Sequence, residues 1–522
     1  MLLSRQQLVA GPTHTLNGLS THTPLPIGVN LIRKDSRSTA AKPRLHNVAP
    51  GAASSGDSSP LENKLAAQKW IDNWRSRQKL SPLNQRKLPS AAQPSEPSSG
   101  AKASQNELAS YLQMWAGLGV MYVADVAIKI ALDSAGIKFP GPLVGMACVV
   151  VALLAVGNQA AEKALAWFGP SLQWIAKWLP LFYVASLVTL PLNLSGIAGD
   201  QLGKIVIILS VGMVGTLLFT AQAAVSIRSI VKTENKEVGK ASPASPLLPS
   251  HWIAWGAILV TSLAATLAAP STLGAQMALP FNLAATILGF LLGSAMPKGV
   301  QAVLHPVVMC ALVANAGAAV HGSIMNVSYE TAQKVYYSKS AEAMGAGDLL
   351  MSFLGVVIIS MGFRIYQQRE TMKRHAPEIL GATLLSSLFS FFSTALAAKA
   401  LGLQADLARA CVPRSVTVAL ALPISAQLDA PAAITAAVVL TQGMLGANFG
   451  PSLMSALGYK DTIARGLAAA ATAGGLGTAS LTSKEPEALP FCALSYSMVG
   501  VISTFLATIP AVRSALITII QG

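Results

Sequence analysis

Long runs without a charged side chain dominate the C-terminal half of the chain, and proline or glycine interrupts them. Residues 430–459 carry no charged side chain, and neither do residues 466–483. Each run is about long enough to cross the hydrocarbon core of a bilayer. The helical pattern is broken at Pro413, Pro423, Pro431, Gly474, Gly475 and Gly477. Broken helices occur at membrane depth only where the freed backbone groups face protein or a water-filled cavity, and in transporters such helix ends hold the substrate.

The composition agrees with a membrane protein. Of 522 residues, 52% are hydrophobic and only 11% are charged, whereas soluble domains carry about 25% charged residues. Four apolar spans precede residue 227 and eight or nine follow residue 251. We therefore predict an all-α polytopic membrane protein with about twelve transmembrane helices, some of them broken or re-entrant.

The charge and the cysteines exclude several functions. The net charge is +15, but residues 1–109 alone hold 14 basic and 6 acidic side chains. No basic patch interleaved with aromatic residues follows, so we expect no nucleic-acid partner. The four cysteines lie in apolar spans or at their edges and form no CxxC pair, so neither a disulfide framework nor a metal site is expected. Without a cofactor motif, HExxH or GxSxG, an intramembrane enzyme is disfavoured.

The first 109 residues differ from the rest. Residues 1–34 contain three basic residues and no acid, and they are rich in Ser, Thr, Gly and Pro without a continuous apolar core. This composition is typical of an organellar transit peptide, which we place at 1–75. Residues 76–109 read as a disordered, basic linker.

Four pieces of the C-terminal half resemble the LrgB family of membrane proteins: VPRSVTVALALPIS, TAAVVLTQGMLGANFGP, DTIARGLA and GGLGTASL. In the first half, FPGPLVGM and LPLFYVASLVTLPL are similar to the LrgA family. The chain thus resembles an LrgA–LrgB fusion, with an LrgA-like domain at 110–226, a linker at 227–250 and an LrgB-like transport domain at 251–522. A weak internal similarity between 354–368 and 413–427 would suit two structural repeats in the second domain. We expect the LrgA-like half to be a separable helical unit.

The segment KEPEALPFCALSYSMVG is similar to the plastid branch of this family, the glycolate/glycerate translocators. The resemblance implies a secondary transporter that exchanges or co-transports glycolate and glycerate across the plastid inner envelope in photorespiration. A homodimer is possible. The alternative is a channel-like or regulatory, holin–antiholin-like membrane protein, as in bacterial relatives. One departure is that the family pattern A-H-G-x-G-T has His where this chain has Gly474.

A carrier of small carboxylates needs a cation and groups that recognise hydroxyls. Arg414 follows a proline break, and a helix starting there would offer free N–H groups to an anion; alternatively its side chain snorkels to the interface. Gly475, Gly477 and Thr478 form a second broken site. The predicted substrate-binding residues are Arg414, Ser415, Thr417, Asn448, Gly475, Gly477 and Thr478. For Asn448 the alternative is a hydrogen bond between packed helices.

Three titratable residues near the spans are candidates for proton coupling: His305, Asp348 and Glu485. For His305 the alternative is a packing role. Asp125 and Lys129 lie four residues apart in the first span, so they share a helix face and can pair; we favour a structural ion pair there.

The loops predict the orientation. Loops 227–250 and 364–376 each hold four basic residues, whereas the opposite loops 133–139 and 321–346 hold one and two. By the positive-inside rule, the N-terminus and both basic loops face the compartment of synthesis, which for a plastid envelope protein would be the stroma.

Overall fold

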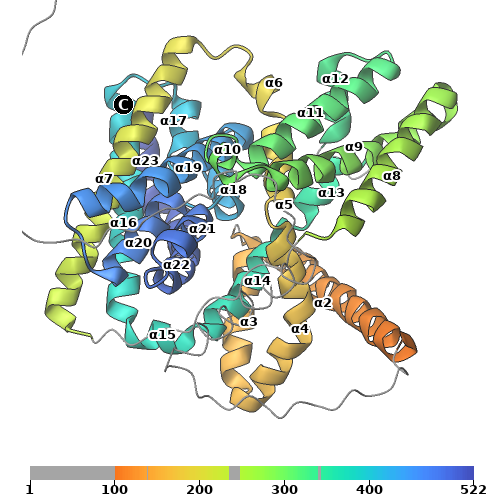
Figure 1. Cartoon of the computed structure of the whole chain (residues 1–522). Helices are drawn as coiled ribbons and strands as arrows, with labels where there is room; N and C mark the ends of the chain where they lie inside the picture. Colours follow the sequence, from red (N-terminus) through yellow and green to blue (C-terminus); the bar gives the residue numbers. More distant parts are fainter. Residues whose placement is uncertain (1–99, 138, 234–246, 339–342, 522) are drawn as a thin grey trace, which may run out of the picture. The chain divides into compact units, whose positions relative to one another are not determined.

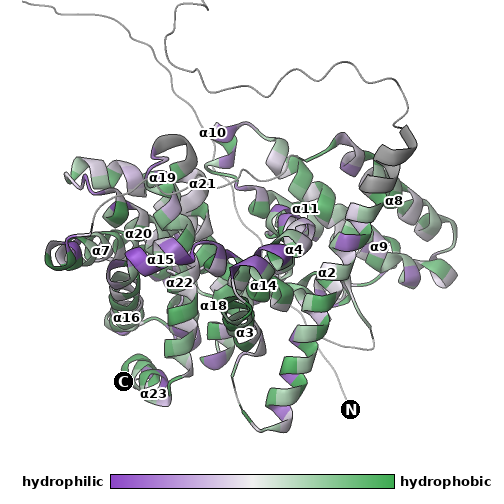
Figure 2. Cartoon of the chain, turned by 90° about the horizontal axis from the view of Figure 1, so that it is seen from below, coloured by the Kyte–Doolittle hydropathy of each residue, from purple (hydrophilic) through white to green (hydrophobic). Residues whose placement is uncertain are grey.

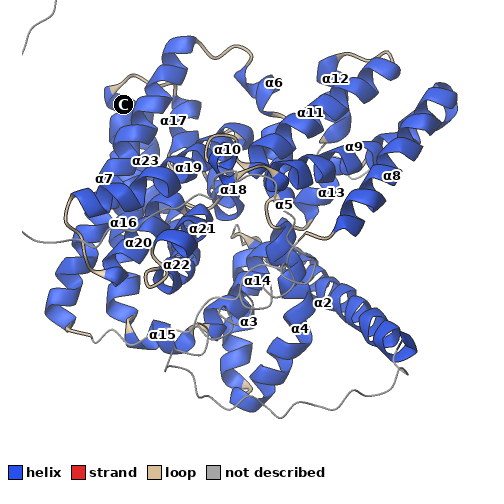
Figure 3. Ribbon diagram, viewed as in Figure 1, coloured by secondary structure: helices blue, strands red, loops and turns tan. Residues whose placement is uncertain are grey.

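The computed structural model describes residues 100–137, 139–233, 247–338 and 343–521. All regular elements in these ranges are helices (Figure 3). The predicted transit peptide lies outside the described residues, as do residues 76–99 and 234–246 of the two predicted linkers.

The helices follow one another as labelled in Figure 1. Those before the second linker are α2 (Gly100–Ser134), α3 (Gly141–Ala155), α4 (Asn158–Trp178), α5 (Leu181–Val188), α6 (Leu190–Leu194) and α7 (Gly199–Val231). After it come α8 (Pro249–Ala268), α9 (Pro270–Ala295), α10 (Lys298–Gln301), α11 (Pro306–Ile324), α12 (Tyr329–Tyr336), α13 (Ala346–Ser352), α14 (Leu354–Gln367), α15 (Arg369–Arg374) and α16 (Ala376–Ala400). The last are α17 (Ala405–Cys411), α18 (Val418–Gln427), α19 (Ala432–Ala456), α20 (Thr462–Ala473), α21 (Gly475–Lys484), α22 (Leu489–Thr508) and α23 (Pro510–Gln521).

Ten helical stretches of the described chain are long and apolar enough to cross a membrane, and α3 and α18 are shorter apolar helices. Figure 2 shows hydrophobic residues along most helices and a hydrophilic α15. Large apolar side chains also point outward; Ile253 and Val260 on α8 are 74% and 64% exposed. Such faces suit lipid rather than water. The prediction of an all-α polytopic membrane protein with about twelve membrane helices is confirmed.

The two halves of the sequence pack together. Helix α7, the last of the LrgA-like half, packs against α16, α19 and α20, while α14 packs against α2 and α3. Phe219 of α7 stacks on Phe389 of α16 with ring centroids 4.2 Å apart. Helices of the first half are therefore in contact with helices of the second half. The domain boundary at 227–250 and the separable first half stay predictions. The sequence of α7 alone does not indicate which helices it packs against.

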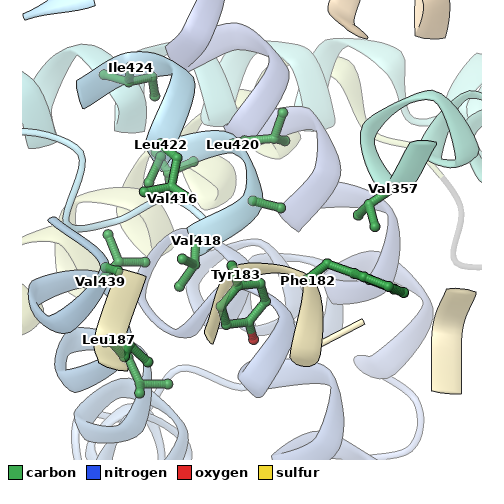
Figure 4. Close-up of a cluster of buried hydrophobic side chains, with 14 of the residues drawn as sticks. Phe182, Tyr183, Leu187, Val357, Val416, Val418, Leu420, Leu422, Ile424 and Val439 are labelled. Carbon is green, nitrogen blue, oxygen red and sulfur yellow. The ribbon is translucent and has the colours of Figure 1, made fainter. Parts of the chain in front are cut away.

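Helix α18 lies at the centre of the packing. It is apolar all round, and all its residues except Pro423, Ala426 and Gln427 are buried. Figure 4 shows Val418, Leu420 and Leu422 among side chains of α5, α14 and α19. A helix with no polar face must be buried in protein, and this burial holds the chain break before α18 in place.

The ion pair predicted in the first span is present. Lys129 Nζ lies 2.6 Å from Asp125 Oδ2, and Asp125 is buried. A Cβ placed on Gly355 of α14 would collide with this carboxylate, so Gly355 is the contact that lets α2 and α14 approach. The geometry is that of a structural pair between packed helices.

Candidate functional site

The first broken helix lies between α17 and α18. Residues 412–415 form turns, and helix α18 starts at Val418 with Thr417 as its N-cap residue in an extended conformation. Pro413 has no N–H to continue a helix, and the amide of Arg414 bonds only to the carbonyl of Cys411, at 3.1 Å. The Thr417 side chain makes no capping hydrogen bond. Its hydroxyl and the first N–H groups of α18 therefore form an open helix start.

The second broken helix lies between α20 and α21, at Gly474. This residue has φ +53° and ψ −135°, a backbone conformation that glycine adopts and L side chains rarely do. The turn ends α20 and restarts the chain as α21 with no side-chain cap. The family's usual histidine at this position would be strained in this conformation. The glycine that replaces it in this chain therefore suits the backbone conformation of residue 474.

The two breaks touch. A Cβ placed on Gly474 would lie 3.6 Å from Cα of Thr417 and 3.7 Å from its backbone nitrogen. The N-termini of α18 and α21 therefore begin side by side. Each N-terminus carries free N–H groups and the positive end of a helix dipole, so a pair of them favours an anion. Beside Gly475 there is open space, because nothing lies within 4 Å of a Cβ placed there.

Arg414 lies in the first break and is only 1% exposed. Its Nε donates to Thr394 Oγ1 at 2.7 Å, its Nη2 to Thr216 Oγ1 at 2.9 Å and its Nη1 to Ser415 Oγ at 3.3 Å. Within the described residues, no carboxylate pairs with it. A buried guanidinium that has hydroxyl partners but no counter-ion is a site that gains from an incoming anion. The buried position also excludes the alternative in which Arg414 snorkels to the interface.

The partners of Arg414 belong to a wider cluster of hydroxyls. Ser390 donates to Ser415 at 2.8 Å, Thr220 and Ser386 share a 2.7 Å hydrogen bond, and Ser503 donates to Ser387 at 3.0 Å. These side chains come from α7, α16, α22 and, for Ser415, the break before α18. The sequence analysis missed Thr216 and Thr394. The signal was present as hydroxyls four residues apart within apolar helices, at 216 and 220 and at 386, 390 and 394.

Glycine makes room for Arg414. A Cβ placed on Gly212 of α7 would lie 2.6 Å from Cζ of the guanidinium. Helix α7 can therefore bring Thr216 to Arg414 only because residue 212 has no side chain. One helix of the first half thus completes the cation site of the second half.

The other predicted substrate residues lie in different surroundings. Thr478 donates to the carbonyl of Gly475 at 2.6 Å, within its own helix. Gly477 is a packing contact, since its Cβ would lie 2.9 Å from the carbonyl oxygen of Ala469. Asn448 donates to the carbonyl of Ala302, in the loop after α10, at 2.8 Å. Of the predicted set, the structure places Arg414, Ser415, Thr417 and Gly475 around the two breaks.

The three proton-coupling candidates are held by local structure. His305 is the N-cap residue of α11, and burial lowers its pKa to about 4. Asp348 accepts from the amides of Gly345 and Ser338, at 3.0 and 2.9 Å, and so caps α13. Glu485 forms a two-point ion pair with Arg465 of α20. Arg465 lies in the DTIARGLA motif, but sequence alone does not show its partner.

Comparison with known proteins identifies the family. Residues 286–512 match the family model described as "LrgB-like family". Over 409 residues the chain is 40% identical to "Plastidal glycolate/glycerate translocator 1, chloroplastic" of Arabidopsis thaliana, and the alignment covers 77% of this chain and 80% of the relative. The chain belongs to the LrgB-like family. The matched region contains both breaks and Arg414, whereas α7 precedes it.

Bacterial relatives align over a shorter part of this LrgB-like chain. An uncharacterized protein of Haemophilus influenzae is 30% identical over 30% of the chain and 68% of its own length. The "Holin-like protein CidB" of Staphylococcus aureus is 25% identical over 31% of the chain and 71% of its own length. No solved structure matches the chain.

Proposed function

We propose that this protein is a secondary transporter, and not an enzyme, that exchanges or co-transports glycolate and glycerate across the plastid inner envelope in photorespiration. Glycolate and glycerate are the substrates that the name of the Arabidopsis relative gives. Ten helical stretches of the described residues are suited to a membrane, which supports a carrier embedded in a bilayer.

One observation carries the proposal: the buried Arg414, which pairs with no carboxylate of the described residues, lies three residues before Thr417, where the starts of α18 and α21 meet at Gly474. The substrate carboxylate would accept from the guanidinium as a charge-assisted pair. The free N–H groups of α18 and α21 would meet its remaining oxygens. The hydroxyls of Ser415 and Thr417 would recognise the hydroxyl groups of the substrate. This arrangement is the transporter use of broken helices.

Uptake into liposomes tests the proposal. Purified protein is reconstituted, and entry of labelled glycolate is followed with and without glycerate inside. We expect internal glycerate to accelerate glycolate entry, because exchange returns the loaded site to the outside. Absence of saturable uptake for both substrates would overturn the proposal.

A channel-like, holin-like function is the second candidate, and it is supported by the similarity to CidB. The same liposomes distinguish the two. A pore releases a trapped dye such as carboxyfluorescein and shows no acceleration by internal substrate, whereas a carrier retains the dye.

The location of the protein in the plastid is also a proposal. It is supported by the acid-poor leader and by the chloroplastic relative. A reporter fused to residues 1–100 should enter plastids, and a reporter found in the cytosol or the secretory pathway would contradict it.

A further inference from the structure

A second buried polar cluster lies where Thr233, just after α7, meets the start of α16. His375 and Glu378 are both 0% exposed, and His375 Nδ1 lies 3.6 Å from Glu378 Oε1. Thr233, just after α7, donates to Glu378 Oε1 and lies 3.3 Å from His375 Nδ1. The imidazole meets the ring of Phe491 edge-on at 5.4 Å. Neither titratable residue is part of the proposed substrate site.

The cluster has unused hydrogen-bonding capacity. His375 Nε2 and Glu378 Oε2 are buried and have no hydrogen-bond partner among the residues that the structure describes, which is costly in an apolar surrounding. That surrounding consists of side chains such as Ala224, Ile379 and Phe491. A neutral imidazole beside a carboxylate leaves one net negative charge, and an added proton removes it.

The cluster joins three transport helices. Arg228 of α7 donates to the carbonyl of Thr233 at 3.2 Å and pairs with Asp461, which is the N-cap of α20. The charged groups facing the pair are thus Arg228 from α7, Asp461 from α20 and Arg374 at the end of α15. Helix α22 contributes Phe491 and has no charged residue over Leu489–Thr508.

The same helices lead to the Arg414 site. Glu378 and Thr394 lie sixteen residues apart on α16, and so do Gly212 and Arg228 on α7. At about 1.5 Å per residue, each interval is about 24 Å. Helix α20 runs from Asp461 to the break at Gly474. Three helices therefore connect the His375–Glu378 cluster with the region of the substrate site.

We propose that His375 and Glu378 form a proton-binding site that couples proton movement to carboxylate transport. In the proton-free state the cluster holds α7, α16 and α20 together through Thr233, Arg228 and Asp461. A proton bound by the pair weakens these contacts and lets the helices move. The inference rests on the proposed function for its transport consequence, but the proton site itself can be measured without substrate.

The first test is the unfolding temperature of purified protein as a function of pH. Burial lowers the pKa of His375 in the folded protein, so the unfolded chain binds the proton more readily. The stabilisation from neutral His375 is present above about pH 6.5 and is lost as the pH falls through the lowered value. The unfolding temperature of the wild type should fall from pH 7.5 to pH 5. His375→Gln should fall less steeply, and Glu370→Gln, an exposed change on α15, should follow the wild type. Equal slopes for His375→Gln and the wild type would overturn the proposal.

The second test separates proton coupling from substrate exchange in liposomes. With one proton per substrate, a gradient of one pH unit supports up to about tenfold accumulation. The wild type should approach this value. His375→Gln and Glu378→Gln should retain exchange at equal pH but accumulate substrate less than twofold in the gradient, while Glu370→Gln should match the wild type.

The outcomes distinguish the two proposals. Gradient-driven accumulation that persists in His375→Gln or Glu378→Gln overturns the proton site, and so does a wild type that exchanges substrate but ignores the gradient. Loss of exchange in a monodisperse variant also overturns it, because the pair would then serve substrate binding. A wild type without exchange of either acid contradicts the proposed function, and the unfolding measurement then still tests the proton site.

Discussion

Thr417 and Gly474 meet across two broken helices, with a Cβ on Gly474 placed 3.6 Å from Cα of Thr417. Both residues precede the first turn of a helix, and neither supplies a side-chain cap to it. The contact brings two positive helix ends to one place. It explains how a region without many charged residues can attract a carboxylate at membrane depth.

The conformation of Gly474 predicts a stability effect. Gly474→Ala has room for its Cβ, since its neighbours lie at ordinary contact distance, but the backbone angles would be strained. We expect a loss of about 1–3 kcal/mol in the free energy of unfolding, seen as a lower unfolding temperature in detergent. Gly475→Ala is the matched control, because the next residue is helical and has open space. Equal stability of the two variants would contradict the conformational argument.

The hydroxyl of Thr417 predicts substrate selectivity. Thr417→Val keeps the branched shape and removes a hydroxyl that makes no capping bond, so α18 should start as before. A substrate hydroxyl left unpaired costs about 1–3 kcal/mol. The KM for glycerate should therefore rise, while competition by acetate, which lacks a hydroxyl, should change little. A parallel loss for both acids would mean that Thr417 has a structural role.

A substitution on α7, which lies outside the residues that match the family model, should affect transport. Gly212→Ala would put a methyl group 2.6 Å from Cζ of Arg414, which displaces the guanidinium from Thr216. Glycolate uptake should fall at least about tenfold, corresponding to about 1.4 kcal/mol, with the protein still monodisperse. Gly215→Ala on the same helix meets only Phe389, at 3.7 Å, and should transport normally. Equal uptake by the two variants would contradict the role of α7.

His305 should not determine the pH dependence of transport in the neutral range. Its pKa is lowered to about 4 by burial, so it is neutral in the folded protein between pH 5 and 8. Its contribution to stability is present above about pH 6.5 and is lost as the pH falls towards 4. His305→Gln should keep the wild-type pH profile of uptake from pH 5.5 to 8. A shifted pH profile of uptake in His305→Gln would contradict this prediction and support a role of His305 in proton transfer.

The sequence predicts the breaks because proline and glycine act locally. Pro413 and Gly474 interrupt helices whatever surrounds them. For Arg414 the sequence leaves two alternatives open, an anion site or a side chain that snorkels to the interface. The contact between Thr417 and Gly474 depends on tertiary packing, as does the partnership of Arg414 with Thr216. No local pattern contains either one.

The same distinction applies to two polar residues whose surroundings depend on the fold. Asn448 has the residue type of a ligand, but its partner is a carbonyl of a distant loop, which only the fold supplies. His375 sits in a segment that reads as a solvated basic loop, with Arg369, Lys373 and Arg374 before it. Its burial arises because α7 and α22 cover the start of α16.

The most direct measurement of the central claim is the concentration dependence of glycerate uptake by Arg414 variants. Arg414→Lys keeps the charge but loses the planar fork that binds a carboxylate at two points, so its KM should rise while transport continues. Arg414→Ala should transport almost nothing, because the buried carboxylate loses its only cation among the described residues of the two breaks. A normal KM and rate in Arg414→Ala would contradict the claim and assign the anion to the helix starts at Thr417 and Gly474 alone.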